Sequence, residues 1–250
     1  MKVSGRAARA GRNQRELPSY FRSVRHVFLA CIACAAVTIF LGTTEREPSR
    51  DAGLVRSGVV VLGDSVAHGA GDEHGLGISG WLSRYSRLPV VDLGVNGART
   101  ANLRALLRDR SVQSQVRSAS LIVLSIGGND LYGDSIARVL ARFLPNIEQE
   151  ITMVKVHSVV ASLRRLNPTA RIDILGLYNP YHHSTLAGWL DEQVNRWDAR
   201  LIWSFAASPQ VNIVRIADLL RRDDRLSPLD RFHPASSGYS LIASRIAAAM

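Results

Sequence analysis

The 250-residue chain contains 46% hydrophobic and 21% charged residues, a composition typical of a globular domain, which excludes disorder, collagen and coiled coil as descriptions of the whole chain. Its two cysteines, Cys31 and Cys34, exclude a disulfide framework. The net charge of +10 is concentrated in residues 1–26, which carry seven basic side chains against one acidic side chain. A basic nucleic-acid binder would spread this charge over its folded body, so we expect no nucleic-acid partner.

An apolar run follows this basic N-terminal arm of residues 1–26. Residues 27–42 contain one polar side chain, Thr38, and no charged residue occurs between His26 and Glu45. As a helix, the uncharged stretch would span about 27 Å, close to the hydrocarbon core of a bilayer. A positive flank before an apolar core predicts a signal-anchor or signal peptide in residues 27–44, with the arm in the cytoplasm. The long arm favours an anchor, while a cleaved signal and a buried helix stay open.

Residues 45–56 are polar and predict a linker, and the remaining residues 57–250 alternate between two hydrophobic patterns. Short β-branched or apolar runs predict five strands, over Ser57–Gly63, Leu88–Val95, Ala119–Ile126, Arg171–Leu177 and Val211–Ile216. Helical spacing of apolar residues, or a run rich in Ala and Ile, predicts helices over Thr100–Arg108, Ile147–Leu166, Leu186–Ala206 and Ser237–Met250. Strands alternating with helices predict a single α/β domain with a doubly wound parallel sheet.

Ligands of such sheets bind outside the carboxyl ends of the strands, so the polar residues at these ends are candidates for a site. The ends carry Gly63-Asp64-Ser65, Gly94-Val95-Asn96-Gly97 and Gly127-Gly128-Asn129-Asp130, and Asp230-Arg231-Phe232-His233-Pro234 precedes the last helix. Each group alone has a plain structural explanation. Ser65 suits a helix cap, the glycine-rich groups suit turns, and a residue before Pro234 suits the start of a helix.

Together, these four groups resemble the SGNH/GDSL hydrolase superfamily, whose sequence blocks carry Ser, Gly, Asn and His in that order. Ser65 matches the first block, Gly97 the second, Asn129 the third and His233 the last, although Gly94 competes with Gly97. The resemblance covers residues 57–250, and residues 171–180 resemble the bacterial lysophospholipase-like branch. It implies a three-layer α/β/α, flavodoxin-like domain with a five-stranded parallel sheet.

The resemblance also implies a chemistry that suits these residue types. Ser65 is the expected nucleophile and needs a base, for which His233 is the natural candidate. Asp230, three residues earlier, is close enough to orient the imidazole. The resemblance implies an oxyanion hole formed by the backbone N–H groups of Ser65 and Gly97 and the side-chain amide of Asn129. We interpret Asp64 as an acceptor that structures the loop.

The expected function is that of a serine esterase or lipase, with no cofactor, acting through an acyl-enzyme on Ser65. Candidate substrates are a lysophospholipid, a short acyl ester or a cell-wall O-acetyl group, and the expected partners are this ester and the membrane. The catalytic domain is expected outside the cytoplasm, at the membrane or secreted. An acyltransferase and a membrane-tethered binding module are the alternatives. An α/β-hydrolase is disfavoured because Ser65 follows the first strand and Ala67 replaces the second glycine of Gly-x-Ser-x-Gly.

Three further groups have open or plain interpretations. His182 and His183, with other histidines elsewhere, lack metal-ligand spacing and are expected to be solvated in a loop, so no metal site is predicted. The glycine-rich stretch around Asp72-Glu73-His74 is either a mobile loop or an entrance flap beside Ser65. Residues that follow the third and fourth strands either line an acyl or alcohol pocket or pack in the core; they are Leu131, Tyr132, Tyr178, Pro180 and Tyr181.

Overall fold

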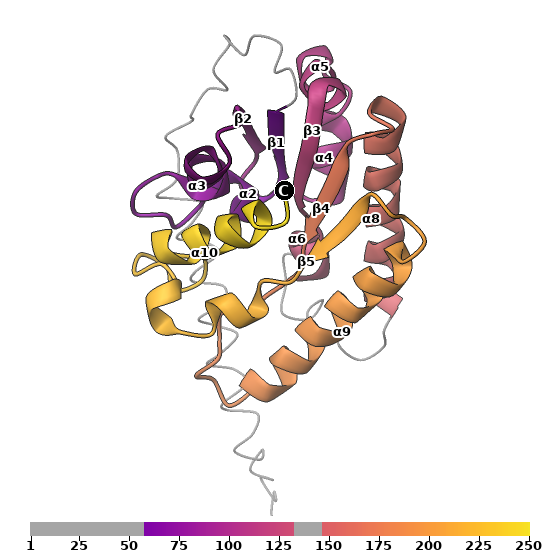
Figure 1. Ribbon diagram of the computed structural model, residues 1–250. Coiled ribbons are helices and arrows are strands. Elements are labelled where there is room, and N and C mark those ends of the chain that lie inside the picture. The colour runs from indigo at the N-terminus through magenta and orange to yellow at the C-terminus, as the bar shows by residue number, and fades with distance from the viewer. Residues whose placement is uncertain (1–57, 133–146) are drawn as a thin grey trace, which may run out of the picture.

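A five-stranded parallel sheet forms the centre of the domain in the computed structural model, which describes residues 58–132 and 147–250 (Figure 1). The strand order is β2-β1-β3-β4-β5. The strands are β1 (Gly58–Gly63), β2 (Val90–Gly94), β3 (Ala119–Ser125), β4 (Arg171–Leu175) and β5 (Val211–Val214). All five expected strands are confirmed. Some strands end one or two residues earlier than expected, because the last residues of the expected ranges lie in the loops at the carboxyl edge.

Helices cover both faces of this sheet and make the expected three layers (Figure 1). One face carries α2 (Ser65–His68), α3 (Gly77–Ser86), α10 (Ser236–Ala247) and the 3₁₀ turn η1 (Ala217–Leu220). The other carries α4 (Thr100–Leu106), α5 (Arg110–Ser118), α6 (Gly128–Tyr132), α8 (Ile147–Leu166) and α9 (Ala187–Phe205). A second 3₁₀ turn, η2 (Asp223–Arg225), precedes the last loop. The four expected helices are confirmed, whereas α3 and α5 were not expected.

The interior position of β1, between β2 and β3, explains why its sequence is an uninterrupted apolar run. Val59 and Val61 pack into the core beneath α3 and α10, while Val60 and Leu62 pack into the core on the opposite face. All four side chains are fully buried. A strand that buries both faces cannot alternate between apolar and polar residues, and this is the usual pattern of parallel sheets.

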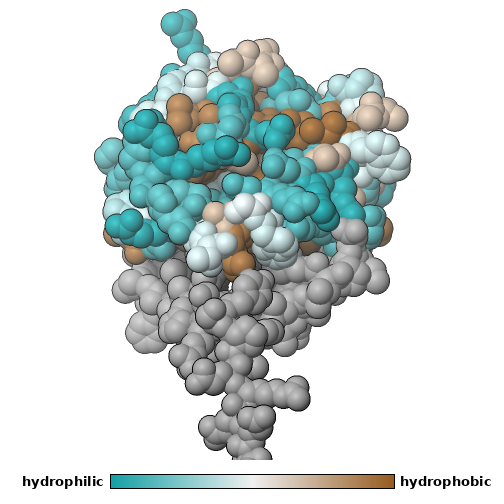
Figure 2. All heavy atoms as spheres, turned by 90° about the horizontal axis from the view of Figure 1, so that it is seen from below, coloured by the Kyte–Doolittle hydropathy of each residue, from teal (hydrophilic) through white to brown (hydrophobic). Residues whose placement is uncertain are grey.

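The carboxyl ends of the strands meet at the lower edge of the domain in Figure 1, and Figure 2 looks onto this edge. The part of this face drawn in colour is mainly hydrophilic, with hydrophobic residues in small groups. None of the described helices combines the length and hydropathy that a membrane crossing requires. The expected basic arm, signal segment and linker lie outside the described residues.

Candidate active site

The turn from β1 into α2 presents Ser65 at the sheet edge. Gly63 ends the strand with a φ of 139°, and a Cβ atom there would lie 1.8 Å from the carbonyl oxygen of Ser125, so only glycine fits. Asp64 caps α2 by accepting a hydrogen bond from the Val66 N–H (3.1 Å), and its carboxylate also accepts one from the Ser125 hydroxyl (2.8 Å). The expectation that Asp64 structures this loop is confirmed.

Burial raises the pKa of the Asp64 carboxyl to about 6, although hydrogen bonds from Ser125, Val66 and Ala67 act against this rise. The folded protein therefore favours protonated Asp64, and this contribution to stability is present below about pH 4 and is lost as the pH rises through 6. We expect the free energy of unfolding of wild type to fall by on the order of 3 kcal/mol across this range relative to Asp64→Asn. Urea titrations at pH 4 and pH 7 measure this difference, and parallel pH profiles of the two proteins would contradict it.

His233 lies in a tight loop between η2 and α10. Leu226 and Pro234 form an antiparallel bridge across this loop, and the Ser227 N–H donates to the carbonyl oxygen of His233 (2.8 Å). Arg231 adopts a left-handed φ of 51°, which closes the turn between Asp230 and His233. The loop thereby brings a carboxylate and an imidazole three residues apart into direct contact.

The structure joins Ser65, His233 and Asp230 in one hydrogen-bonded chain. The His233 Nε2 atom lies 2.9 Å from the Ser65 hydroxyl oxygen, across 168 residues of sequence, and the His233 Nδ1 atom lies 2.6 Å from Asp230 Oδ2. His233 is 4% exposed. Burial acts to raise the pKa of Asp230, but the hydrogen bonds from the His233 ring and from the N–H groups of Phe232 and His233 outweigh it, so this pKa lies below its ordinary value. Asp230 is therefore an ionised acceptor that orients the imidazole.

Two glycines lie at the carboxyl end of β2, and the structure distinguishes between them. A Cβ atom on Gly94 would lie 2.2 Å from the backbone nitrogen of His68, so this glycine permits close packing of β2 against α2. Gly97 instead has a left-handed φ of 71°, and a Cβ atom there would meet nothing within 4 Å. Because Gly97 faces open space at the sheet edge, it is better placed than Gly94 to approach a ligand.

Asn129, in the first turn of α6, lies next to the loop that carries Gly97. Its side-chain amide donates a hydrogen bond to the carbonyl oxygen of Ala98 (3.0 Å). The Val95 N–H donates to the carbonyl oxygen of Gly63 (2.9 Å), which ties the same loop to the end of β1. The ends of β1, β2 and β3 thus bring Ser65, Gly97 and Asn129 to one edge, as the sequence analysis expected.

Asp130 is a positioning residue that the sequence analysis did not identify. Its buried carboxylate accepts hydrogen bonds from the Thr100 N–H and the Thr100 hydroxyl, both at 2.8 Å, and Lys155 lies 3.5 Å away. These contacts fix the start of α4 to α6, so that the loop of Gly97 keeps its position relative to Asn129. Only the adjacent pair Asn129-Asp130 hinted at this role, since Thr100 is 30 residues away in the sequence.

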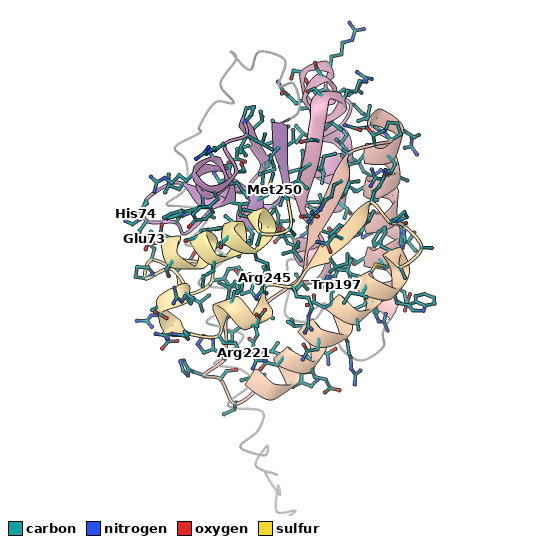
Figure 3. All side chains as sticks on the ribbon, in the orientation of Figure 1. Glu73, His74, Trp197, Arg221, Arg245 and Met250 are labelled. Carbon is teal, nitrogen blue, oxygen red and sulfur yellow. The ribbon has the colours of Figure 1, made fainter. Side chains whose placement is uncertain are left out.

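The glycine-rich stretch after α2 is anchored to the start of α10. Glu73 accepts a hydrogen bond from the Ser236 N–H (2.9 Å), and the His74 ring is bonded to the Ser236 hydroxyl (2.9 Å). Figure 3 shows Glu73 and His74 beside the first turn of α10. These contacts do not fit the mobile-loop alternative, while the entrance-flap alternative stays a prediction. The loop also packs on His233, because a Cβ atom on Gly71 would lie 2.7 Å from the His233 Cβ.

Gly71→Ala should therefore push His233 away from Ser65 and lower kcat by at least about tenfold, which corresponds to only ~1.4 kcal/mol of lost transition-state stabilisation. Gly75→Ala is the matched control, because Gly75 also has a positive φ (66°) but a Cβ atom there would meet nothing within 4 Å. Both variants strain the backbone and should lower the melting temperature, but only Gly71→Ala should also displace the imidazole and lower kcat. Steady-state kinetics and melting temperatures of the two variants therefore separate the two effects. Equal kcat values in the two variants would contradict the proposed contact.

The remaining candidates divide between packing and surface positions. Leu131 and Tyr178 are buried in the two cores, and the Tyr178 hydroxyl donates to the carbonyl oxygen of Phe232 (2.8 Å), which favours packing over a substrate pocket. His183 is exposed, as expected, but the expectation of solvation is wrong for His182, whose side chain is only 13% exposed. The His182 ring is covered because it bonds to Asp223 on η2.

Comparisons with known proteins agree with this geometry. The model of the GDSL-like lipase/acylhydrolase family matches residues 61–241. The chain is 29% identical to the uncharacterised protein YpmR of Bacillus subtilis, over 75% of this chain and 79% of YpmR. It is 24% identical to the spore germination lipase LipC of Bacillus licheniformis, over 75% and 93% of the two chains. The crystal structure of the lipase Lip_vut3 from a goat rumen metagenome shares the fold, with a TM-score of 0.62, 24% identity and coverage of 77% and 97%. The chain belongs to the GDSL-like lipase/acylhydrolase family and is a GDSL-type hydrolase that acts on esters.

Proposed function

We propose that this hydrolase is a serine esterase that forms an acyl-enzyme on Ser65. The observation that carries the proposal is the hydrogen-bonded chain from the Ser65 hydroxyl through His233 to Asp230. His233 Nε2 takes the hydroxyl proton as Ser65 Oγ bonds to the ester carbonyl carbon. The same proton then goes to the leaving alcohol as the carbon–oxygen ester bond breaks. Water repeats the sequence on the acyl-enzyme and releases the acid, which restores the Ser65 hydroxyl.

The negative charge that develops on the carbonyl oxygen needs fixed donors. The Ser65 N–H lies in the first turn of α2, where helix geometry leaves such groups without an intrahelical acceptor. Gly97 offers a backbone N–H on an open loop, and Asn129 offers an amide with two N–H bonds, one of which is used on Ala98. We propose these three groups as the oxyanion hole.

Asn129→Ala should then lower kcat by roughly 10²–10³ with little change in KM, because the lost interaction strengthens only as the oxyanion forms. Asn167→Ala is the control. The Asn167 side-chain amide donates to the carbonyl oxygens of Val116 and of Ala119 at the start of β3 (both 2.8 Å), so its loss removes a structural amide without removing an oxyanion donor. Near-normal kcat in Asn129→Ala, with a fall in Tm like that of the control, would assign Asn129 to packing alone.

The proposed substrates are esters with an apolar acyl group, such as a lysophospholipid or a short acyl ester, or a cell-wall O-acetyl group. A hollow of about 300 Å³ beside the Gly97 loop supports an apolar acyl group, since small-molecule sites begin near this size. Its lining consists of Gly63, Val95, Ala98, Asn102, Leu103, Ala105 and Leu106. Hydrolysis rates of p-nitrophenyl esters of graded chain length test this proposal. A full series without turnover by the wild-type protein, under conditions where it is folded, would refute it.

We propose in addition that the catalytic domain acts outside the cytoplasm. The proposal rests on the basic arm of residues 1–26 and the apolar run that follows it. Protease added to intact cells or spheroplasts should digest the domain. Digestion only after lysis would refute this topology.

A further inference from the structure

Two histidines and one aspartate, outside the triad, converge from segments about 40 residues apart. The Nε2 atoms of His182 and His183 lie 2.8 Å and 2.7 Å from one and the same oxygen, Asp223 Oδ1. All three atoms lie within 4.8 Å of one another. Two imidazole nitrogens and a carboxylate oxygen facing one point are a donor set that transition metals favour.

We propose that His182, His183 and Asp223 bind a divalent transition-metal ion such as Zn²⁺. Bonds of about 2.0–2.2 Å from zinc to imidazole and carboxylate ligands place tetrahedral ligands about 3.3 Å apart. The two nitrogen–oxygen distances therefore have to lengthen by about 0.5 Å to admit the ion. Both Nε2 atoms would coordinate as neutral imidazoles, so each Nε2 proton leaves that atom on binding and each ring carries its one proton on Nδ1; water would fill the fourth position.

The ligands are held in place before any ion binds. The Asn179 side chain accepts from the Tyr181 N–H (2.8 Å) and donates to the carbonyl oxygen of Ala187 (3.1 Å), which fixes the loop of the two histidines at both ends. The His182 ring is largely buried, and its Nδ1 atom has no hydrogen-bond partner among the described residues. Because the Asp223 carboxylate accepts the Nε2 proton, this proton has to move to Nδ1 when Nε2 binds the ion, and no donor among the described residues occupies Nδ1.

The surrounding charges also leave Asp223 directed at the histidines. The neighbouring guanidinium groups of Arg222 and Arg225 pair with Asp224 instead, at 3.0 Å and 3.7 Å.

The position of the site gives the ion a structural role. Asp223 begins the segment that carries Asp230 and His233, and this segment is closed by the bridge between Leu226 and Pro234. A bound ion would fasten the triad segment to the loop after β4. We therefore expect it to stabilise the catalytic loop and to take no part in the acyl-transfer chemistry.

The test is titration of the full chain with Zn²⁺, by calorimetry and by thermal unfolding. Wild type should bind one more equivalent of Zn²⁺ than Asp223→Asn. Its Tm should rise by about 5 °C or more when the free Zn²⁺ concentration is a hundred times the Kd. His183→Ala and Asp223→Asn should each weaken this binding by at least about 100-fold, the upper range for loss of a mere outer-shell partner. His157→Ala, which changes a remote histidine, should bind like wild type.

The side chains of His183 and Asp223 are 74% and 57% exposed, so their replacement removes no core packing. His26, Cys31 and Cys34 are present in every variant, so zinc bound by them cancels from the comparison. Equal stoichiometry and equal Tm shifts in wild type and Asp223→Asn would overturn the proposal. The proposal would also be overturned if Zn²⁺ left the Tm of wild type unchanged while metal-free Asp223→Asn melted below metal-free wild type. The three residues would then form only a stabilising carboxylate–imidazole contact.

Discussion

Replacement of Ser65 by Ala should lower ester hydrolysis by roughly 10⁶-fold, the loss known for removal of a serine nucleophile. Ser65 Oγ is the oxygen that contacts His233 Nε2, so its loss leaves the base with no group to activate at this position. The helix start should survive, because the cap of α2 is the Asp64 side chain and not Ser65. Ser65→Ala should therefore lose hydrolysis of a p-nitrophenyl ester, while its melting temperature stays close to that of wild type.

Labelling by a fluorophosphonate provides the direct measurement of the nucleophile. Wild type should be labelled at Ser65 and Ser65→Ala should not be labelled. Ser237→Ala is a suitable control. Ser237 lies in the first turn of α10, and its hydroxyl donates to the carbonyl oxygen of Asp224 in η2 and not to the imidazole of His233. Modification of any other serine in wild type would refute the assignment.

The parts of the fold that were predictable are those that depend on local patterns. β1 and β3 were evident because strands buried on both faces need uninterrupted apolar runs. The apolar spacing also predicted α8, although two of its apolar residues, Ile151 and Val154, are exposed. Ser65 and His233 were recognised because the short groups that contain them, together with those of Gly97 and Asn129, resemble the sequence blocks of a known family.

The unexpected helices lacked such patterns. α3 includes Gly77 and Gly80, which disfavour helix in isolation, and it forms because Ile78 and Leu82 are buried beside α10. α5 has only two apolar residues, so its signal was the cap: Asp109 accepts hydrogen bonds from the N–H groups of the first turn. Tertiary packing decided the first helix and a cap decided the second.

The parts of the site that were not predictable depend on contacts between distant segments. Gly94 and Gly97 look alike in sequence, and only the proximity of α2 to Gly94 separates them. The packing of Gly71 on His233 joins residues more than 160 positions apart, and the contact of Asp223 with His182 joins residues 41 positions apart. A single sequence carries no signal for contacts of this kind.

Asp230→Asn should lower kcat by up to ~10⁴, the loss expected when the orienting carboxylate of a serine triad becomes an amide. The turn itself should persist, because the Asn oxygen can still accept from the N–H groups of Phe232 and His233, which now bond to Asp230 Oδ1 at 2.9 Å and 3.0 Å. The other carboxylate oxygen becomes an NH₂ group that faces His233 Nδ1. This amide donates instead of accepting, so it favours the tautomer with the proton on Nε2, and that atom can no longer take the proton of Ser65.

The variant Asp230→Ala separates this tautomer effect from simple loss of a contact. Alanine leaves His233 Nδ1 to water, which can accept its proton, so the productive tautomer stays accessible, and we expect Asp230→Ala to be more active than Asp230→Asn. Steady-state kinetics at pH 8, with circular dichroism to confirm the fold, measure the order of the two variants. A loss under about tenfold in Asp230→Asn corresponds to less than ~1.4 kcal/mol and would show that groups other than this carboxylate orient the imidazole. An Asn variant as active as the Ala variant would likewise contradict the tautomer argument, because Asn keeps the turn bonds from Phe232 and His233 that Ala loses and is at a disadvantage only through the donor that it presents to Nδ1.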